Sequence, residues 1–170
     1  MFREPFSASA EKREQKVGRA IRSRLLCSNG RIEMSGWDIF VSRVLTKREI
    51  RMALAVILGI KQGNIVIVKS ISEREDVNDA TEILCQTFLC GDEHFPLRID
   101  IYVHKQQIAA SNLSIFKKLS DIVRADVLVS DETPDPVSFW LIHYGNGTER
   151  TIVSDSILDE QNMKEIDLKD

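Results

Sequence analysis

Residues 37–68 read WDIFVSRVLTKREIRMALAVILGIKQGNIVIV and contain a strand pattern, a helix pattern and a second strand pattern, in that order. Apolar residues alternate over residues 37–42, which predicts a short strand. Thr46 and Glu49 have the spacing of a capping box, and apolar residues at helical spacing follow until a glycine ends the helix. The β-branched run at residues 65–68 is typical of a strand covered on both faces. This unit predicts a sheet with a helix packed on it.

The residues after this unit predict further strands and one more helix. The strands are expected at residues 83–90, 97–103, 127–129, 137–144 and 148–154, and the helix at residues 112–124. In the fourth predicted strand, four apolar residues alternate with Arg98, Asp100 and Tyr102, which predicts one buried side and one solvent-facing side.

Two features of the last third concern its turns and its end. Asn146 and Gly147 separate the last two strands, and this dipeptide favours a type I′ turn, in which both residues have positive φ. Residues 155–170 hold a few apolar residues among many acids, so we expect a weak helix or a loosely docked tail.

The predicted fold class is α+β. We expect a mixed sheet of about six to seven strands with two main helices on one face, in the order β-α-β-β-β-α-β-β-β, plus an N-terminal helix. That additional helix spans residues 9–26, where Val17, Ile21 and Leu25 recur among basic residues. The predicted organisation is an N-terminal basic helical extension at residues 1–33 and a single α/β domain at residues 34–170.

The composition indicates a globular protein. The chain has 170 residues, of which 43% are hydrophobic and 29% charged, so neither a disordered nor a fibrous protein is expected. The sequence has no run approaching the about 20 apolar residues of a membrane span, and its three cysteines do not form a disulfide framework. We therefore expect a soluble cytoplasmic protein without a membrane partner.

Charge is unevenly distributed along the chain. Residues 1–33 carry eight basic and four acidic residues, whereas residues 125–170 carry three basic and eleven acidic residues. The net charge of the whole chain is −3, which gives no general attraction to nucleic acid. A nucleic-acid-associated regulator that uses residues 10–26 stays an alternative, because a basic helix can contact phosphates.

The sequence lacks a recognisable catalytic or cofactor motif. Glycine-rich phosphate loops and regularly spaced metal ligands are absent, so no cofactor, metal site or catalytic residue is predicted. An enzyme of unrecognised type stays an alternative, because Cys90 and His94 bracket one hairpin loop and carboxylates cluster near the end of the chain. Buried cysteines are, however, most often small hydrophobic residues of the core.

The second half resembles a group of small bacterial proteins. The runs that carry the resemblance are Phe95–Tyr102, Val127–Glu132 and Phe139–Ile142 before Asn146-Gly147. Some of the proteins that it resembles look like immunity proteins of polymorphic or contact-dependent toxin systems. The resemblance covers residues 34–160 and carries no functional residue with it. It implies a non-catalytic protein-binding module that inhibits a cognate bacterial toxin.

A proline-stiffened acidic loop is the predicted contact surface for such a partner. Asp131, Glu132 and Asp135 lie in this loop, and Asp155 follows the neighbouring hairpin. A stiff loop loses little entropy on binding, and acidic side chains favour a basic partner such as a toxin domain. The sequence does not determine the oligomeric state.

Overall fold

The computed structural model describes residues 26–27, 30–31, 34–71, 80–104, 112–131, 133, 137–153 and 155–170. The strands are β1 (Leu26–Cys27), β2 (Gly30–Arg31), β3 (Met34–Val41), β4 (Ile65–Val68), β5 (Ile83–Leu89), β6 (Leu97–His104), β7 (Val127–Ser130), β8 (Ser138–His143), β9 (Gly147–Ile152) and β10 (Lys164–Glu165). The α-helices are α1 (Lys47–Leu58), α2 (Asn112–Val123) and α3 (Asp155–Leu158), and the 3₁₀ helices are η1 (Gln62–Asn64) and η3 (Glu160–Asn162).

The main sheet is mixed and has eight strands. Its order is β10-β5-β6-β3-β7-β8-β9, and β4 pairs with β5 beside β10. The β4–β5 pair is parallel, and the other pairs of this sheet are antiparallel. The predicted α+β class and the order β-α-β-β-β-α-β-β-β are confirmed, and β10 is an additional strand that the sequence patterns did not indicate.

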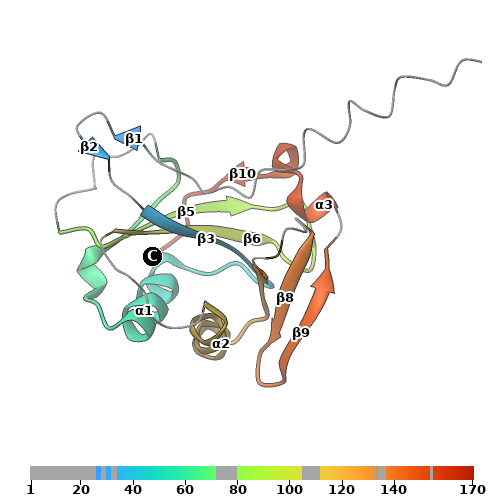
Figure 1. Ribbon diagram of the computed structural model, residues 1–170. Coiled ribbons are helices and arrows are strands. Elements are labelled where there is room, and N and C mark those ends of the chain that lie inside the picture. The colour runs from blue at the N-terminus through green and yellow to red at the C-terminus, as the bar shows by residue number, and fades with distance from the viewer. Residues whose placement is uncertain are drawn as a thin grey trace, which may run out of the picture.

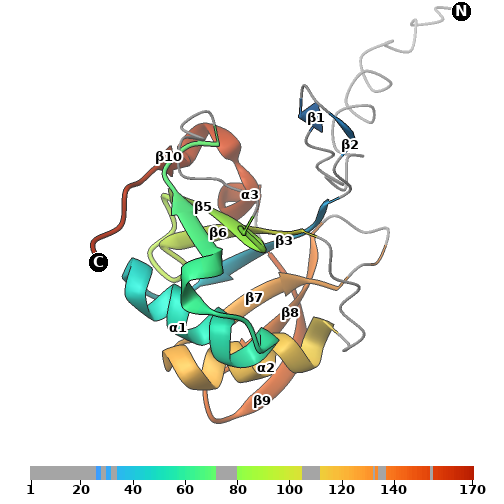
Figure 2. The same cartoon turned by 90° about the vertical axis from the view of Figure 1, so that its left-hand side faces the viewer.

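Helices α1 and α2 cover one face of the sheet, as predicted (Figure 1), and a view turned by 90° shows the same layers (Figure 2). Thr46 and Glu49 form the predicted capping box, with Thr46 Oγ1 accepting from the Glu49 N–H at 3.2 Å and Glu49 Oε2 accepting from the Thr46 N–H at 2.8 Å. Gly59 ends α1 with φ 68°. In the described part of the chain, no helix is long and apolar enough to cross a bilayer.

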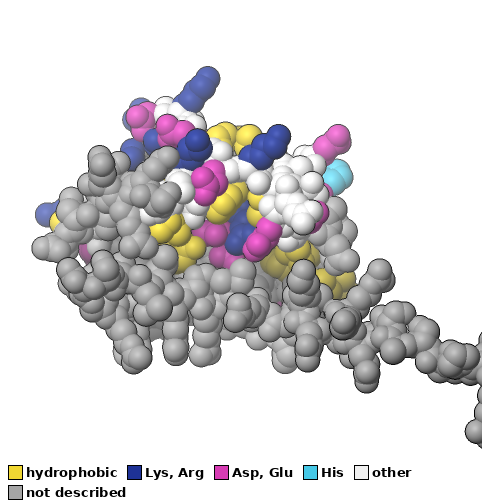
Figure 3. Space-filling view, turned by 90° about the horizontal axis from the view of Figure 1, so that it is seen from above, with side chains coloured by type: hydrophobic (Ala, Val, Ile, Leu, Met, Phe, Trp, Pro, Cys, Tyr) yellow, Lys and Arg dark blue, Asp and Glu magenta, His cyan; other side chains and the backbone are white. Residues whose placement is uncertain are grey.

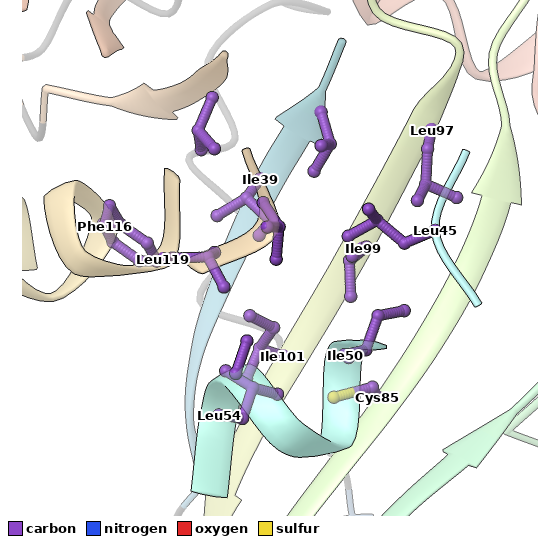
Figure 4. Packing of buried hydrophobic residues seen from close by; sticks show 14 of the residues in the cluster. Ile39, Leu45, Ile50, Leu54, Cys85, Leu97, Ile99, Ile101, Phe116 and Leu119 are labelled. Atoms are coloured by element: carbon purple, nitrogen blue, oxygen red, sulfur yellow. The ribbon is translucent and has the colours of Figure 1, made fainter. Parts of the chain in front are cut away.

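The main hydrophobic core lies between these two helices and the sheet. Ile50 and Leu54 of α1 pack with Phe116 and Leu119 of α2 in one cluster of buried residues, which includes the inward side chains of the central strands (Figure 4). The rings of Trp37 and Phe116 meet edge to face, with centroids 5.5 Å apart. The helices are held by apolar burial on one side of each, as their periodicity predicts.

The opposite side of the sheet is called the second face. It is formed by side chains of the central strands, Asp38, Phe40, Leu84, Gln86, Phe88, Arg98, Asp100 and Tyr102. The prediction that one side of β6 faces solvent is wrong, because the residues on that side, Arg98, Asp100 and Tyr102, are only 9%, 6% and 5% exposed. Part of the cover comes from the chain after β9, which lies above this face in Figure 1. Ile157 of α3 packs in a cluster with Phe40.

The expectation of a weak helix or a loosely docked tail at residues 155–170 is confirmed in part, because α3 is a helix of only four residues, whereas residues 163–170 dock along β5. Strand β10 pairs with β5, and Thr87 Oγ1 donates to the Ile166 carbonyl at 2.8 Å. Leu168 is 5% exposed and belongs to the main core. The Lys47 N–H at the start of α1 donates to the Lys169 carbonyl at 2.8 Å, which gives a partner to one of the helix's first amide groups.

The β8–β9 hairpin differs in detail from the prediction. Gly147 has the expected positive φ, 106°, and Gly145 has φ 72°. A type I′ turn needs positive φ at both of its central residues, and Asn146 is not among the described residues with positive φ. The prediction of a type I′ turn at Asn146-Gly147 is therefore wrong. The connection is instead a three-residue loop, because His143 and Gly147 are paired across the hairpin.

The predicted N-terminal helix lies, apart from its last residue, outside the described residues. That last residue, Leu26, is in β1, which pairs with β2 in a separate two-stranded sheet. Strand β3 begins at Met34, where we placed the start of the compact domain. The division into an extension at residues 1–33 and a domain at residues 34–170 stays a prediction.

Candidate protein-binding site

The predicted acidic loop is described in part. Asp131 follows β7, and its side chain is 0% exposed. Its carboxylate accepts hydrogen bonds from Ser138 Oγ at 2.6 Å and from the Thr133 N–H at 3.0 Å. Arg150 Nε on β9 lies 3.7 Å from the same carboxylate. Asp131 therefore ties the start of the loop to the β8–β9 hairpin.

The charge of Asp131 is stabilised by these contacts. Burial acts to raise its pKa, but the hydrogen bonds from Ser138 and Thr133 outweigh that effect and hold the pKa below its ordinary value. Glu132 and Asp135 lie outside the described residues, and of Asp155, at the start of α3, the backbone is described. The partner-binding role of these four residues stays a prediction.

Strand β9 is the last strand of the sheet on the side away from β5. The Val153 N–H donates to the Val137 carbonyl at 3.0 Å, so odd-numbered residues of this strand direct their backbone groups toward β8. The backbone groups of Thr148, Arg150 and Ile152 consequently point away from the sheet. Among the described residues, no strand pairs with this outer edge. The Ile152 residue is 74% exposed.

The hairpin surface next to this edge is aromatic and acidic. The Arg150 guanidinium lies 4.9 Å from the centroid of the Trp140 ring, a cation–π contact. His143 at the hairpin end lies 3.3 Å from Asp126 and 3.2 Å from Glu149. The hydrogen bond with Glu149 is the main cause that raises the pKa of His143.

A charged cluster on the second face was not predicted. Arg98 Nε donates to Asp100 Oδ1 at 2.6 Å and its Nη2 donates to Asp100 Oδ2 at 3.1 Å, a bidentate pair. The same Nη2 lies 3.3 Å from Asp38 Oδ2. The rings of Phe40 and Phe88 lie 5.9 and 5.5 Å from the guanidinium carbon. Basic and acidic side chains lie among hydrophobic ones on this side of the molecule (Figure 3).

The two carboxyl groups of this cluster compete for one guanidinium. Burial, reinforced by the charge of Asp38, raises the pKa of Asp100 to about 6 against the lowering effect of Arg98. Burial also raises the pKa of Asp38, again opposed by Arg98. When both carboxyl groups are ionised, one negative charge has no positive partner within the cluster.

The residues proposed for an enzyme do not form an activated nucleophile. Burial raises the pKa of the Cys90 thiol to about 11, which favours the unreactive protonated form. Cys85 is completely buried, and burial raises its pKa as well. The backbone N–H of His94 donates to Asp92 Oδ1 within the same loop. Within the residues that the structure describes, no group of three or more histidine, cysteine or carboxylate side chains could hold a metal ion.

Comparisons of the chain with protein-family models, with curated proteins and with solved structures gave no match. The candidate site therefore rests on the geometry of this chain alone.

Proposed function

We propose that the protein is a non-catalytic binding module for a basic protein, and that it acts in the cytoplasm as an immunity protein that inhibits a cognate bacterial toxin. The observation that supports this proposal best is the outer edge of β9. An edge strand with unpaired backbone groups is a site where an extended segment of a partner can add to the sheet. Three residues, Thr148, Arg150 and Ile152, offer such groups.

The side chains around this edge suit a partner with basic residues. Glu149 and Asp126 have side chains that are 62% and 38% exposed, beside the edge at the hairpin end. Exposed acids steer a basic partner toward the site and raise the rate of encounter, while the backbone pairing and the exposed Ile152 supply contact. Asp131 contributes by fixing Arg150 rather than by presenting its own carboxylate.

The proposal can be tested by co-expression with the protein encoded by the adjoining reading frame. If that protein is a toxin, its expression alone arrests growth, and co-expression with this chain restores growth. Growth arrest that co-expression leaves unchanged, or a neighbour without toxicity, would contradict the immunity role.

Two substitutions at one position test the strand edge itself. Ile152→Pro removes an outward N–H without touching the pairing with β8, and proline is tolerated on edge strands. Ile152→Thr keeps the N–H and serves as the matched control. We expect Ile152→Pro to weaken protection from the toxin and Ile152→Thr to retain most of it. Equal protection by both variants would remove the edge from the interface.

A further inference from the structure

The outer edge of β9 carries backbone groups in a pattern that can pair with a copy of itself. Because the odd-numbered residues bond to β8, the N–H and C=O groups that point outward belong to every second residue, Thr148, Arg150 and Ile152. When two such edges meet around a two-fold axis, each outward N–H of one copy faces an outward C=O of the other. The backbone of this edge is therefore self-complementary.

The side chains of β9 leave its outer edge open. Ile152 is the most exposed of the large hydrophobic residues that the structure describes. Natural edge strands are often protected from pairing by charged side chains, prolines or bulges. Residues 147–152 contain no proline and pair with β8 without a bulge. The Arg150 guanidinium lies over the Trp140 ring, and its Nε lies 3.7 Å from Asp131 Oδ2, so this charge is drawn back toward β8.

The side chains also select one register for a self-pair. Because the outward groups lie at every second residue, the axis of an antiparallel self-pair passes through a residue, and the registers that overlap most of the strand are centred on Glu149, Arg150 or Thr151. The first two place a charged residue directly opposite its own copy, which is unfavourable. The third places two threonines opposite each other, and it sets the aliphatic stem of Arg150 against Ile152 of the second copy.

We propose that two copies of this chain pair reversibly through β9, in the antiparallel register centred on Thr151, and so join their sheets into one. The contact uses one strand of six residues from each copy, and small interfaces of this kind form and dissociate readily. The pair occupies the edge that a toxin would use, so self-pairing withholds that edge until the toxin displaces the second copy. This consequence rests on the proposed function, whereas the self-pairing itself does not.

A cysteine placed on the axis tests both the contact and its register. In the proposed register, the two Thr151 residues form a non-hydrogen-bonded pair with Cα atoms about 4.5 Å apart, which suits a disulfide. We expect purified Thr151→Cys, incubated with oxidised glutathione, to double its apparent mass on a non-reducing gel. Thr148→Cys is the matched control, because its copy lies about 20 Å away along the strands, and it should stay monomeric. The wild-type chain measures the background from its own cysteines. Thr151→Cys that cross-links no faster than Thr148→Cys would overturn the proposal.

Sedimentation velocity measures the same association without an added cysteine. The sedimentation coefficient of the wild-type protein should rise with protein concentration. Ile152→Pro removes the N–H that bonds to the second copy and should abolish this rise, whereas Ile152→Thr keeps the N–H and should retain most of it. A rise that Ile152→Pro leaves unchanged, or a wild-type protein that stays monomeric at every concentration, would overturn the self-pairing. Both measurements use purified protein without a toxin, so their failure is distinct from a failure of the growth test.

Discussion

Asp38 of β3 and Asp100 of β6 are direct neighbours across two antiparallel strands, and both face Arg98. Like charges directly opposite each other in a sheet are unfavourable, and here burial adds to the cost. Arg98 forms its bidentate bond with Asp100 and a longer contact with Asp38. The central strands therefore hold a charge imbalance that depends on pH.

The first prediction concerns this pH dependence. Because the folded-state pKa of Asp100 is raised from 3.8 to about 6, the folded state binds more protons than the unfolded state between these values. The free energy of unfolding should therefore fall as the pH rises from about 4 to 6, by up to about 3 kcal/mol from this group. Asp38→Asn should flatten this fall in urea titrations, because it removes the facing charge.

The control for that experiment is Asp121→Asn, the same chemical change at an exposed residue of α2. It should leave the pH profile as in the wild type. An Asp38→Asn profile that runs parallel to the wild-type profile would show that the two carboxyl groups do not interact.

The second prediction concerns Arg98. Arg98→Met keeps much of the side-chain volume but leaves the buried Asp100 and the partly exposed Asp38 without their cation. It should lower the free energy of unfolding by about 3–5 kcal/mol at pH 7.5, the usual cost of breaking a buried ion pair from one side. The loss should shrink at pH 4.5, where protonation of the carboxyl groups removes the unpaired charge.

Arg150→Met is the matched control, because the Arg150 side chain is 61% exposed and exposed ion pairs contribute little. We expect its effect to stay below about 1 kcal/mol at both pH values. A loss for Arg98→Met that is the same at pH 4.5 and 7.5 would mean that lost packing, not charge, explains it.

The third prediction concerns the C-terminal residues. Leu168→Ala should lower the free energy of unfolding by about 2–5 kcal/mol, because the side chain is buried in the main core. Lys169→Ala should cost little, since its side chain is exposed and its contact with Lys47 uses the backbone carbonyl. Urea titrations at pH 7.5 compare the two. Equal costs would show that the end of the chain does not pack as described.

The fourth prediction concerns two glycines in open surroundings. Neither Gly63 nor Gly147 has an atom within 4 Å of a Cβ that would be added, but Gly147 has φ 106°. Gly147→Val should therefore destabilise the protein by about 1–3 kcal/mol through backbone strain. Gly63→Val lacks that strain and should cost less. Thermal and urea unfolding of both variants would reveal the difference, and a Gly147→Val variant as stable as the wild type would contradict the hairpin geometry.

Much of the fold could be predicted because its signals are local. Three kinds of signal act over only a few residues: the capping box of Thr46 and Glu49, the apolar periodicity of α1 and α2, and the β-branched runs. Together they predict the order of the elements. The alternation of apolar and polar residues gave a wrong prediction where parts of the chain distant in sequence cover the sheet. Arg98 and Tyr102 alternate with apolar residues as a solvent-facing side would, yet the second face is buried.

Local patterns in the sequence are enough to predict the element order, the side of each helix that packs on the sheet, and the uneven charge of the two ends. Which charged side chains meet depends on how distant strands pair. Asp38 reaches Asp100 because β6 lies between β5 and β3, a pairing of strands separated by more than 50 residues in the chain. Leu168 is buried for the same reason, since β10 lies on β5 and carries the chain end back to α1. Such contacts follow from strand order and register, and these are set by the burial of the whole sheet rather than by any local run of residues.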